Sequence, residues 1–92
     1  MIRLNCFFKA NSQEGYNKAL AAAKTLTEKS QKHAGCKAYD VFGSETRSDV
    51  FMICETWEDE DSLAKHAQTP EFGECVAIIN QNGEMKIEKL NM

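Results

Sequence analysis

Proline and histidine are scarce in this sequence, and several motifs that mark common enzyme mechanisms are missing. One proline and two histidines occur among 92 residues. The histidines, His33 and His66, are not at a metal-binding spacing. There is no G-x-G-x-x-G, no phosphate-binding P-loop and no G-x-S-x-G turn. We therefore expect no metal and no cofactor, and neither a nucleotide nor a serine-nucleophile mechanism has support.

Long apolar runs and clustered basic residues are also missing. No stretch approaches the roughly 18 apolar residues of a membrane-spanning helix, and the first residues do not resemble a secretory signal. The net charge of −3 disfavours a nucleic-acid partner, because phosphates require clustered lysine and arginine. The four cysteines form no C-x-x-C pair. We therefore expect buried free thiols and a cytoplasmic location.

The sequence does contain a regular alternation of strand and helix patterns. Strands are predicted over residues 2–8, 36–42, 50–57 and 84–92. Apolar residues at i, i+3, i+4 spacing predict a helix that starts with Asn11 as its N-cap and stops before Gly35. A second helix begins after the capping residue Asp59 and is interrupted at Thr69-Pro70. The length of 92 residues predicts one domain over residues 1–92.

The order β-α-β-β-α-β is typical of the ferredoxin-like α+β fold. Right-handed crossovers place the helices on one face of a four-stranded antiparallel sheet, with the first and third strands central. The third strand is apolar on both faces, as a strand covered on both sides should be. The second sheet face carries an apolar row that is large for a soluble monomer. A homodimer would cover it, and the alternative is a monomer that covers it with its own side chains and tail.

Two polar side chains are the first candidates for chemistry. His66 shares a helix face with Leu63 and Ala67, so its imidazole is expected to point inward, where it can bind or exchange a proton near neutrality. The alternative is a structural histidine that is bonded to the backbone or to a carboxylate. Asn5 lies in a central strand and must find partners. These are either a ligand or neighbouring side chains.

Three further residues have both a structural and a functional interpretation. Glu55 is a carboxylate on the same face of the third strand as Trp57 and also needs partners. Trp57 and Phe72 are either core residues or the wall of a binding site. A structural role alone is expected for His33 at the end of the first helix, where a positive charge would interact favourably with the helix dipole.

Two stretches together resemble the antibiotic biosynthesis monooxygenase family. They run from Gly35 to Phe42 and from Phe51 to Glu60, and the pattern E-x-W…L-x-x-H…P-x-F then continues through His66 to Phe72. The resemblance implies a dimeric α/β barrel. It also implies a cofactor-independent monooxygenase that oxidises small electron-rich phenols or quinols with molecular oxygen. Such a site needs only to bind the ring, assist proton removal and hold the anion in a dry pocket.

The resemblance also implies roles for individual residues. His66 would handle the proton and Asn5 would hydrogen-bond the substrate oxygen, which makes these two the candidate catalytic residues. Substrate-binding residues would be Trp57, Phe72, Tyr39 and Glu55. The same superfamily includes haem-degrading enzymes, but His66 stands where their tryptophan would be and Val76 where their haem ligand would be. Two alternatives remain open. One is an isomerase or lyase of a small hydroxy-carbonyl compound, and the other is a non-catalytic dimer that binds a small ligand.

Overall fold

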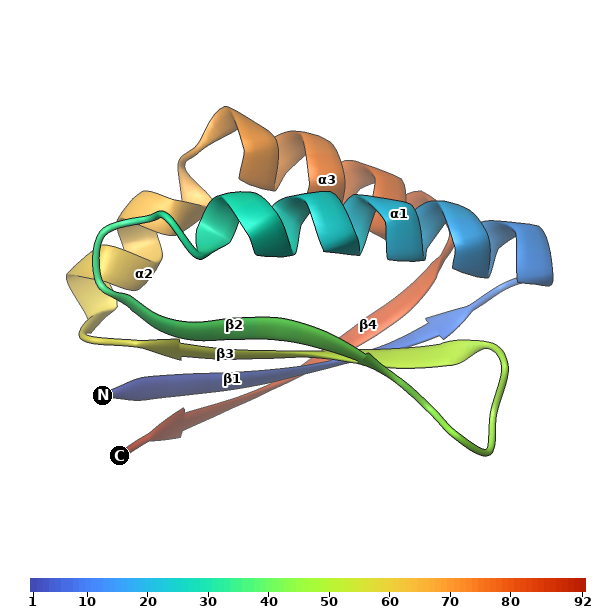
Figure 1. Ribbon diagram of the computed structural model, residues 1–92, viewed down its shortest axis with the longest axis horizontal. Helices are drawn as coiled ribbons and strands as arrows, with labels where there is room; N and C mark the ends of the chain where they lie inside the picture. Colours follow the sequence, from blue (N-terminus) through green and yellow to red (C-terminus); the bar gives the residue numbers. More distant parts are fainter.

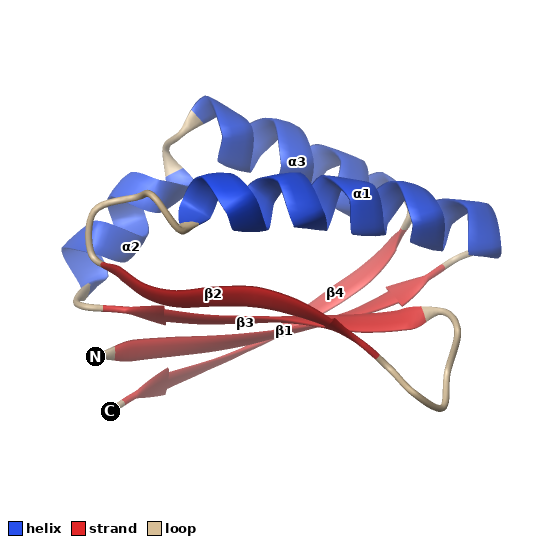
Figure 2. Ribbon diagram, viewed as in Figure 1, coloured by secondary structure: helices blue, strands red, loops and turns tan.

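The computed structural model describes all 92 residues and confirms the ferredoxin-like order of elements. The strands form one antiparallel sheet with the order β2-β3-β1-β4, and the helices lie together on one of its faces (Figures 1 and 2). The first and third strands are central, as predicted. The elements are β1 (Ile2–Ala10), α1 (Gln13–Ser30), β2 (Cys36–Gly43), β3 (Val50–Trp57), α2 (Glu60–Ala67), α3 (Pro70–Gln81) and β4 (Gly83–Asn91).

Helix α1 begins one residue later than the sequence predicted. Ser12 is its N-cap, and the Ser12 hydroxyl accepts a hydrogen bond from the N–H of Gly15 at 2.9 Å. The prediction of Asn11 as the cap is therefore wrong. The backbone N–H of Asn11 instead donates to the carbonyl of Asn82 at 2.9 Å, which ties the start of α1 to the end of α3. No helix of the protein is long and apolar enough to cross a membrane.

The predicted second helix is divided into α2 and α3 at Thr69-Pro70. The Thr69 hydroxyl caps α3 by accepting from the N–H of Phe72 at 3.3 Å, and it donates to the carbonyl of His66 at 2.8 Å. Pro70 occupies the first turn of α3, where its missing N–H leaves no helical hydrogen bond unmade. The two short helices therefore run in different directions, and residues of both approach the end of α1.

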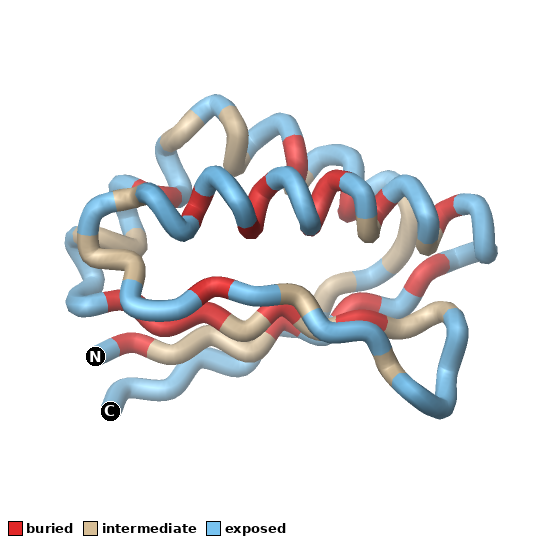
Figure 3. The backbone as a smooth tube through the Cα atoms, viewed as in Figure 1, coloured by how far each residue is buried: buried red, intermediate tan, exposed pale blue.

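The two faces of the sheet have different environments. Side chains between the sheet and the helices form the core: Phe8, Phe51 and Trp57 from the strands, and Leu26 and Ile79 from the helices, are almost fully buried. Figure 3 shows the buried positions gathered where the helix layer meets the sheet. Cross-strand partners share a face, so Phe7, Met52 and Phe42 lie together on the opposite face. Phe7 is 45% exposed and Phe42 is 52% exposed, so this second face is open in the single chain.

Candidate functional site

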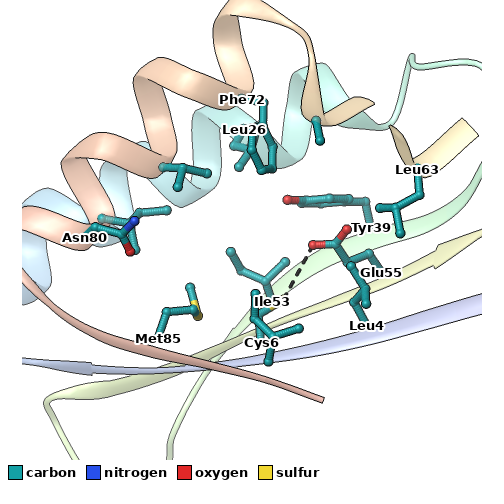
Figure 4. A pocket seen from close by; sticks show the side chains of 14 residues that line it. Leu4, Cys6, Leu26, Tyr39, Ile53, Glu55, Leu63, Phe72, Asn80 and Met85 are labelled. Carbon is teal, nitrogen blue, oxygen red and sulfur yellow. Dashed lines mark hydrogen bonds between the residues drawn. The ribbon is translucent and has the colours of Figure 1, made fainter. Parts of the chain in front are cut away.

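A cavity of about 450 Å³ lies between the helices and the sheet (Figure 4). Its volume falls in the range of small-molecule sites, roughly 300–1,000 Å³. Of the 14 residues that line it, 12 are hydrophobic, and the two others are Glu55 and Asn80. A cavity with so few polar groups favours a largely apolar ligand whose polar atoms meet the protein at one or two points.

Glu55 is the only ionisable carboxyl group in the cavity wall. Strand β3 places it on the face toward the helices, and it is only 5% exposed. Its carboxylate accepts a hydrogen bond from the indole N–H of Trp57 at 2.8 Å and one from the thiol of Cys6 at 3.6 Å. Burial raises the pKa of Glu55, while the bonds from Trp57 and Cys6 act in the opposite direction. These two donors, together with Tyr39, favour the ionised form of the carboxyl group and so oppose the rise in its pKa.

Tyr39 lies beside Glu55, and its hydroxyl also projects into the cavity (Figure 4). Burial and the neighbouring carboxylate raise the pKa of the Tyr39 hydroxyl well above its ordinary value. The same two causes raise the pKa of the Cys6 thiol. Both groups therefore stay protonated at neutral pH, where they can donate hydrogen bonds but are poor proton acceptors.

The two aromatic residues that were predicted as a binding wall occupy different places. Phe72 extends from α3 and lines the cavity. Trp57 is 0% exposed and is absent from the lining, and it contacts the lining through the hydrogen bond to Glu55 and through its ring, which lies edge-on to that of Tyr39. The indole therefore supports the wall from behind.

His66 points inward, as the sequence predicted, and is only 2% exposed. Its ring centroid lies 4.5 Å from that of Trp57 and 5.1 Å from that of Phe72. The Tyr39 ring is 5.7 Å away. His66 therefore adjoins two residues of the cavity wall, but it is not itself part of the lining. Its Nε2 atom is buried and has no hydrogen-bond partner.

The other ring nitrogen of His66 makes a contact that sequence reasoning missed. Nδ1 of His66 lies 2.9 Å from Nδ1 of His33, and Nε2 of His33 lies 2.9 Å from Oε2 of Glu71. His33 thus bonds two side chains and is more than a charge at the end of α1. No spacing rule joins three residues from different elements, so the sequence held no signal for this group. Burial, with His33 close by, lowers the pKa of His66 to about 4.

Asn5 lies away from the cavity, on the open face of the sheet. Its side-chain amide donates to Glu88 at 2.9 Å, and its oxygen accepts from Arg3 at 3.0 Å. This is the second of the two arrangements that the sequence left open for Asn5, in which neighbouring side chains are the partners. A residue on this face cannot bond a molecule held between the sheet and the helices.

The chain belongs to the antibiotic biosynthesis monooxygenase family, whose model matches residues 1–78. A Synechocystis protein, sll1783, is 32% identical over 75 residues, which cover 77% of this chain and 51% of that protein. The chain therefore spans about half the length of this relative. The Bacillus subtilis protein named "Putative monooxygenase YcnE" is 29% identical over 77 residues, covering 84% of this chain and 80% of that protein.

Solved structures share the whole fold. A conserved protein from Bacteroides thetaiotaomicron, described as of unknown function and as a "Possible Oxidoreductase", is 50% identical with a TM-score of 0.94. The match covers 99% of this chain and 96% of that chain. A structure described as an antibiotic biosynthesis monooxygenase has a TM-score of 0.90 at 23% identity, covering 100% of this chain and 98% of that chain. The second likeness concerns the fold alone.

Proposed function

We propose that this protein is a cofactor-independent monooxygenase that oxidises a small electron-rich aromatic compound of the phenol or quinol type with molecular oxygen. The observation that carries the proposal is the apolar cavity of about 450 Å³ with a single carboxyl group in its wall. Membership of a monooxygenase family supports the same reaction class. The volume suits a compound of one or two fused rings, whose faces would contact the apolar walls.

The chemistry needs little from the protein beyond binding and proton transfer. Loss of a hydroxyl proton gives a phenolate, which can pass an electron to oxygen. The two radicals then combine to form a carbon–oxygen bond. Cleavage of the O–O bond leaves one oxygen atom on the ring, which becomes a quinone, and the other leaves as water with two hydrogens from the substrate. The first proton must therefore be held and later returned, which requires a positioned acid–base group.

We assign the proton transfer to His66 and the anchoring of the substrate to Glu55. A quinol has two hydroxyl groups, and one of them can donate a hydrogen bond to the Glu55 carboxylate in the wall. The other would give its proton to Nε2 of His66, which has no partner in the protein. Tyr39 and Phe72 lie next to both the cavity and His66. The assignment therefore requires one of these rings to move when the substrate binds.

Oxygen uptake with a panel of hydroquinones and naphthols tests the reaction. Catalysed uptake with one quinone formed per oxygen molecule is the expected result, and uptake no faster than autoxidation across the panel would exclude it. His66→Asn keeps a donor near the position of Nδ1 but removes Nε2, so kcat should fall roughly 100-fold or more. Glu55→Gln should mainly raise KM. If Glu55→Gln abolishes kcat and His66→Asn does not, Glu55 is the base.

We also propose that the working form is a homodimer. Phe7, Phe42 and Leu90 are each 45% or more exposed, and the pairing register places all of them on the sheet face that the helices leave open. A second copy in a twofold contact would remove this apolar surface from water. The four cysteines are free thiols, which suits the reducing cytoplasm that we propose as the location.

A further inference from the structure

Three ionisable side chains form a hydrogen-bonded line from the surface to the interior. Glu71 lies in the first turn of α3, His33 follows the end of α1, and His66 lies in α2. Both contacts in the line measure 2.9 Å. The side chains of Glu71 and His33 are 26% and 16% exposed, whereas His66 is 2% exposed. The line therefore connects solvent with the aromatic surroundings of His66.

The hydrogen positions along this line follow from what each atom can do. An ionised carboxylate only accepts hydrogen bonds, so Nε2 of His33 must carry the hydrogen that Glu71 receives. A neutral imidazole has a single N–H, which leaves Nδ1 of His33 as an acceptor. Nδ1 of His66 must then donate to it. Neutral His66 therefore has no hydrogen on Nε2, and a bare lone pair remains on that buried atom.

That lone pair has no partner in the protein. The imidazole lies within 6 Å, centroid to centroid, of the rings of Trp57, Phe72 and Tyr39. Of these, Phe72 and Tyr39 also line the cavity. Buried polar atoms without a partner are uncommon in folded proteins and ask for a specific explanation. A hydroxyl group brought in by a ligand would supply the missing donor.

We propose that Glu71, His33 and His66 form a proton relay, in which His66 takes a proton on Nε2 while it passes its Nδ1 proton to Nδ1 of His33. The inference rests on the proposed function, because the proton comes from the substrate hydroxyl. The hydroxyl loses one proton, His66 gains one and loses one, and His33 becomes an imidazolium beside the Glu71 carboxylate. When the O–O bond breaks, Nε2 of His66 gives its proton to the departing peroxide oxygen, and His33 returns a proton to Nδ1 of His66. His33 and Glu71 are positioning residues that act through His66.

The relay avoids placing a lasting positive charge on the buried His66 ring. Burial and the nearby His33 hold the pKa of His66 at about 4, so a charge that stayed on this ring would be strongly disfavoured. In the relay the charge rests on His33, which is closer to solvent and bonded to a carboxylate. The other ionisable groups around the line are Lys29 and Cys75 near Glu71, Tyr39, whose ring lies 5.7 Å from that of His66, and Glu55, which is bonded to Trp57.

The tautomer of His66 tests the relay without any substrate. Long-range proton–nitrogen NMR of the uniformly 15N-labelled full chain distinguishes N–H from bare ring nitrogens. At pH 8 we expect His66 to carry its hydrogen on Nδ1. An imidazolium at His33 would make both of its nitrogens donors, so in that state His66 should switch to the Nε2–H tautomer. An Nε2–H tautomer of His66 at pH 8 would overturn the relay.

Two variants separate a relay from a merely structural contact. His33→Asn places an amide oxygen near the position of Nδ1, so it can still accept from His66 but cannot take up a proton. The Nδ1–H tautomer should therefore persist, and its switch on acidification should disappear. His33→Leu removes the acceptor, so His66 should no longer be held in the Nδ1–H tautomer. A pH switch that survives in His33→Asn would contradict the proposal, and so would an unchanged tautomer in His33→Leu. If His33→Leu does not fold, His33→Asn still decides.

Kinetics with an active quinol give the second readout. His33→Asn should lower kcat roughly 10- to 100-fold with little change in KM, and Glu71→Gln should lower it less. Glu74→Gln makes the same change of charge on α3 without contact to His33 and serves as the matched control. Absence of quinol turnover with the expected tautomer would refute the proposed reaction alone. Turnover that is unchanged in His33→Asn would refute the relay alone.

Discussion

The hydrogen bond from Trp57 opposes the rise in the pKa of the buried Glu55 carboxyl group, and its loss should reduce stability in a pH-dependent way. Trp57→Phe keeps an aromatic ring and removes the indole N–H, which lies 2.8 Å from Oε1 of Glu55. Both residues are buried, at 0% and 5% exposure. A hydrogen bond to a charged group contributes about 1.5–3 kcal/mol, and the smaller ring removes about 1 kcal/mol of apolar burial. We therefore expect Trp57→Phe to cost about 3 kcal/mol at pH 7.

The sign of the pH dependence follows from the raised pKa of Glu55. A carboxyl group whose pKa is higher in the folded state stabilises the fold below its unfolded pKa, about 4.3 for glutamate. That contribution is lost as the pH rises through the folded pKa. The Trp57 bond lowers this pKa, so Trp57→Phe raises it further and deepens the loss. The free-energy cost of Trp57→Phe should be about 1 kcal/mol larger at pH 7 than at pH 4, where the bond is neutral.

Urea denaturation followed by circular dichroism measures both quantities. The protein concentration is held fixed, because the stability of the proposed dimer would depend on it. Glu55→Gln is the matched control, since it removes the charge and keeps the shape. In the Glu55→Gln background, Trp57→Phe should cost about 1 kcal/mol less at pH 7 and should show no pH dependence. Equal costs at both pH values, or equal costs in the two backgrounds, would refute the claim that the indole stabilises a buried charge.

Four further substitutions test the scaffold and the proposed dimer interface. Ser12→Ala should lower the free energy of unfolding by about 1 kcal/mol through loss of the α1 cap; chemical denaturation at neutral pH measures this, and no change would contradict it. Gly35→Ala should destabilise by more than about 1 kcal/mol, because φ is +81° and a Cβ would overlap Ser62. Gly73→Ala, with nothing within 4 Å of a Cβ, should instead stabilise α3 by about 0.5–1 kcal/mol, and thermal melts compare the two. In sedimentation experiments Phe42→Asp should convert the proposed dimer to a monomer. A dimer that persists would show that the open sheet face is not the interface.

The fold could be predicted from the sequence because its signals are local and repeated. Alternation along residues 2–8, the i, i+3, i+4 pattern of the helices and the apolar third strand all depend on near neighbours in the chain. The break at Thr69-Pro70 could also be predicted, since proline disfavours the helical conformation in the residue before it. The one-residue error at Asn11 arose because Asn and Ser are about equally good N-caps, and adjacent candidates differ only in tertiary contacts.

The site was less accessible to sequence reasoning. The inward direction of His66 followed from helix periodicity, and Glu55 was recognised as a carboxylate that needs partners. The contacts among His66, His33 and Glu71 could not be foreseen, because they depend on how three elements meet. The support of Glu55 by Trp57 and Cys6 combines a neighbour on the same strand with one across the sheet. Only the first of these was visible in the sequence.

The interruption at Thr69-Pro70 limits which sequence changes the contacts among His66, His33 and Glu71 can tolerate. In one continuous helix, residues 66 and 71 would point about 140° apart, and a single imidazole could not touch both. The bend lets them converge on His33. Substitutions that straighten the chain at Thr69-Pro70, or that add or delete a residue there, would thus separate Glu71 from His33 and His66. This would happen even if all three side chains were retained. In redesign, the geometry of this short junction must be conserved together with the residues it orients.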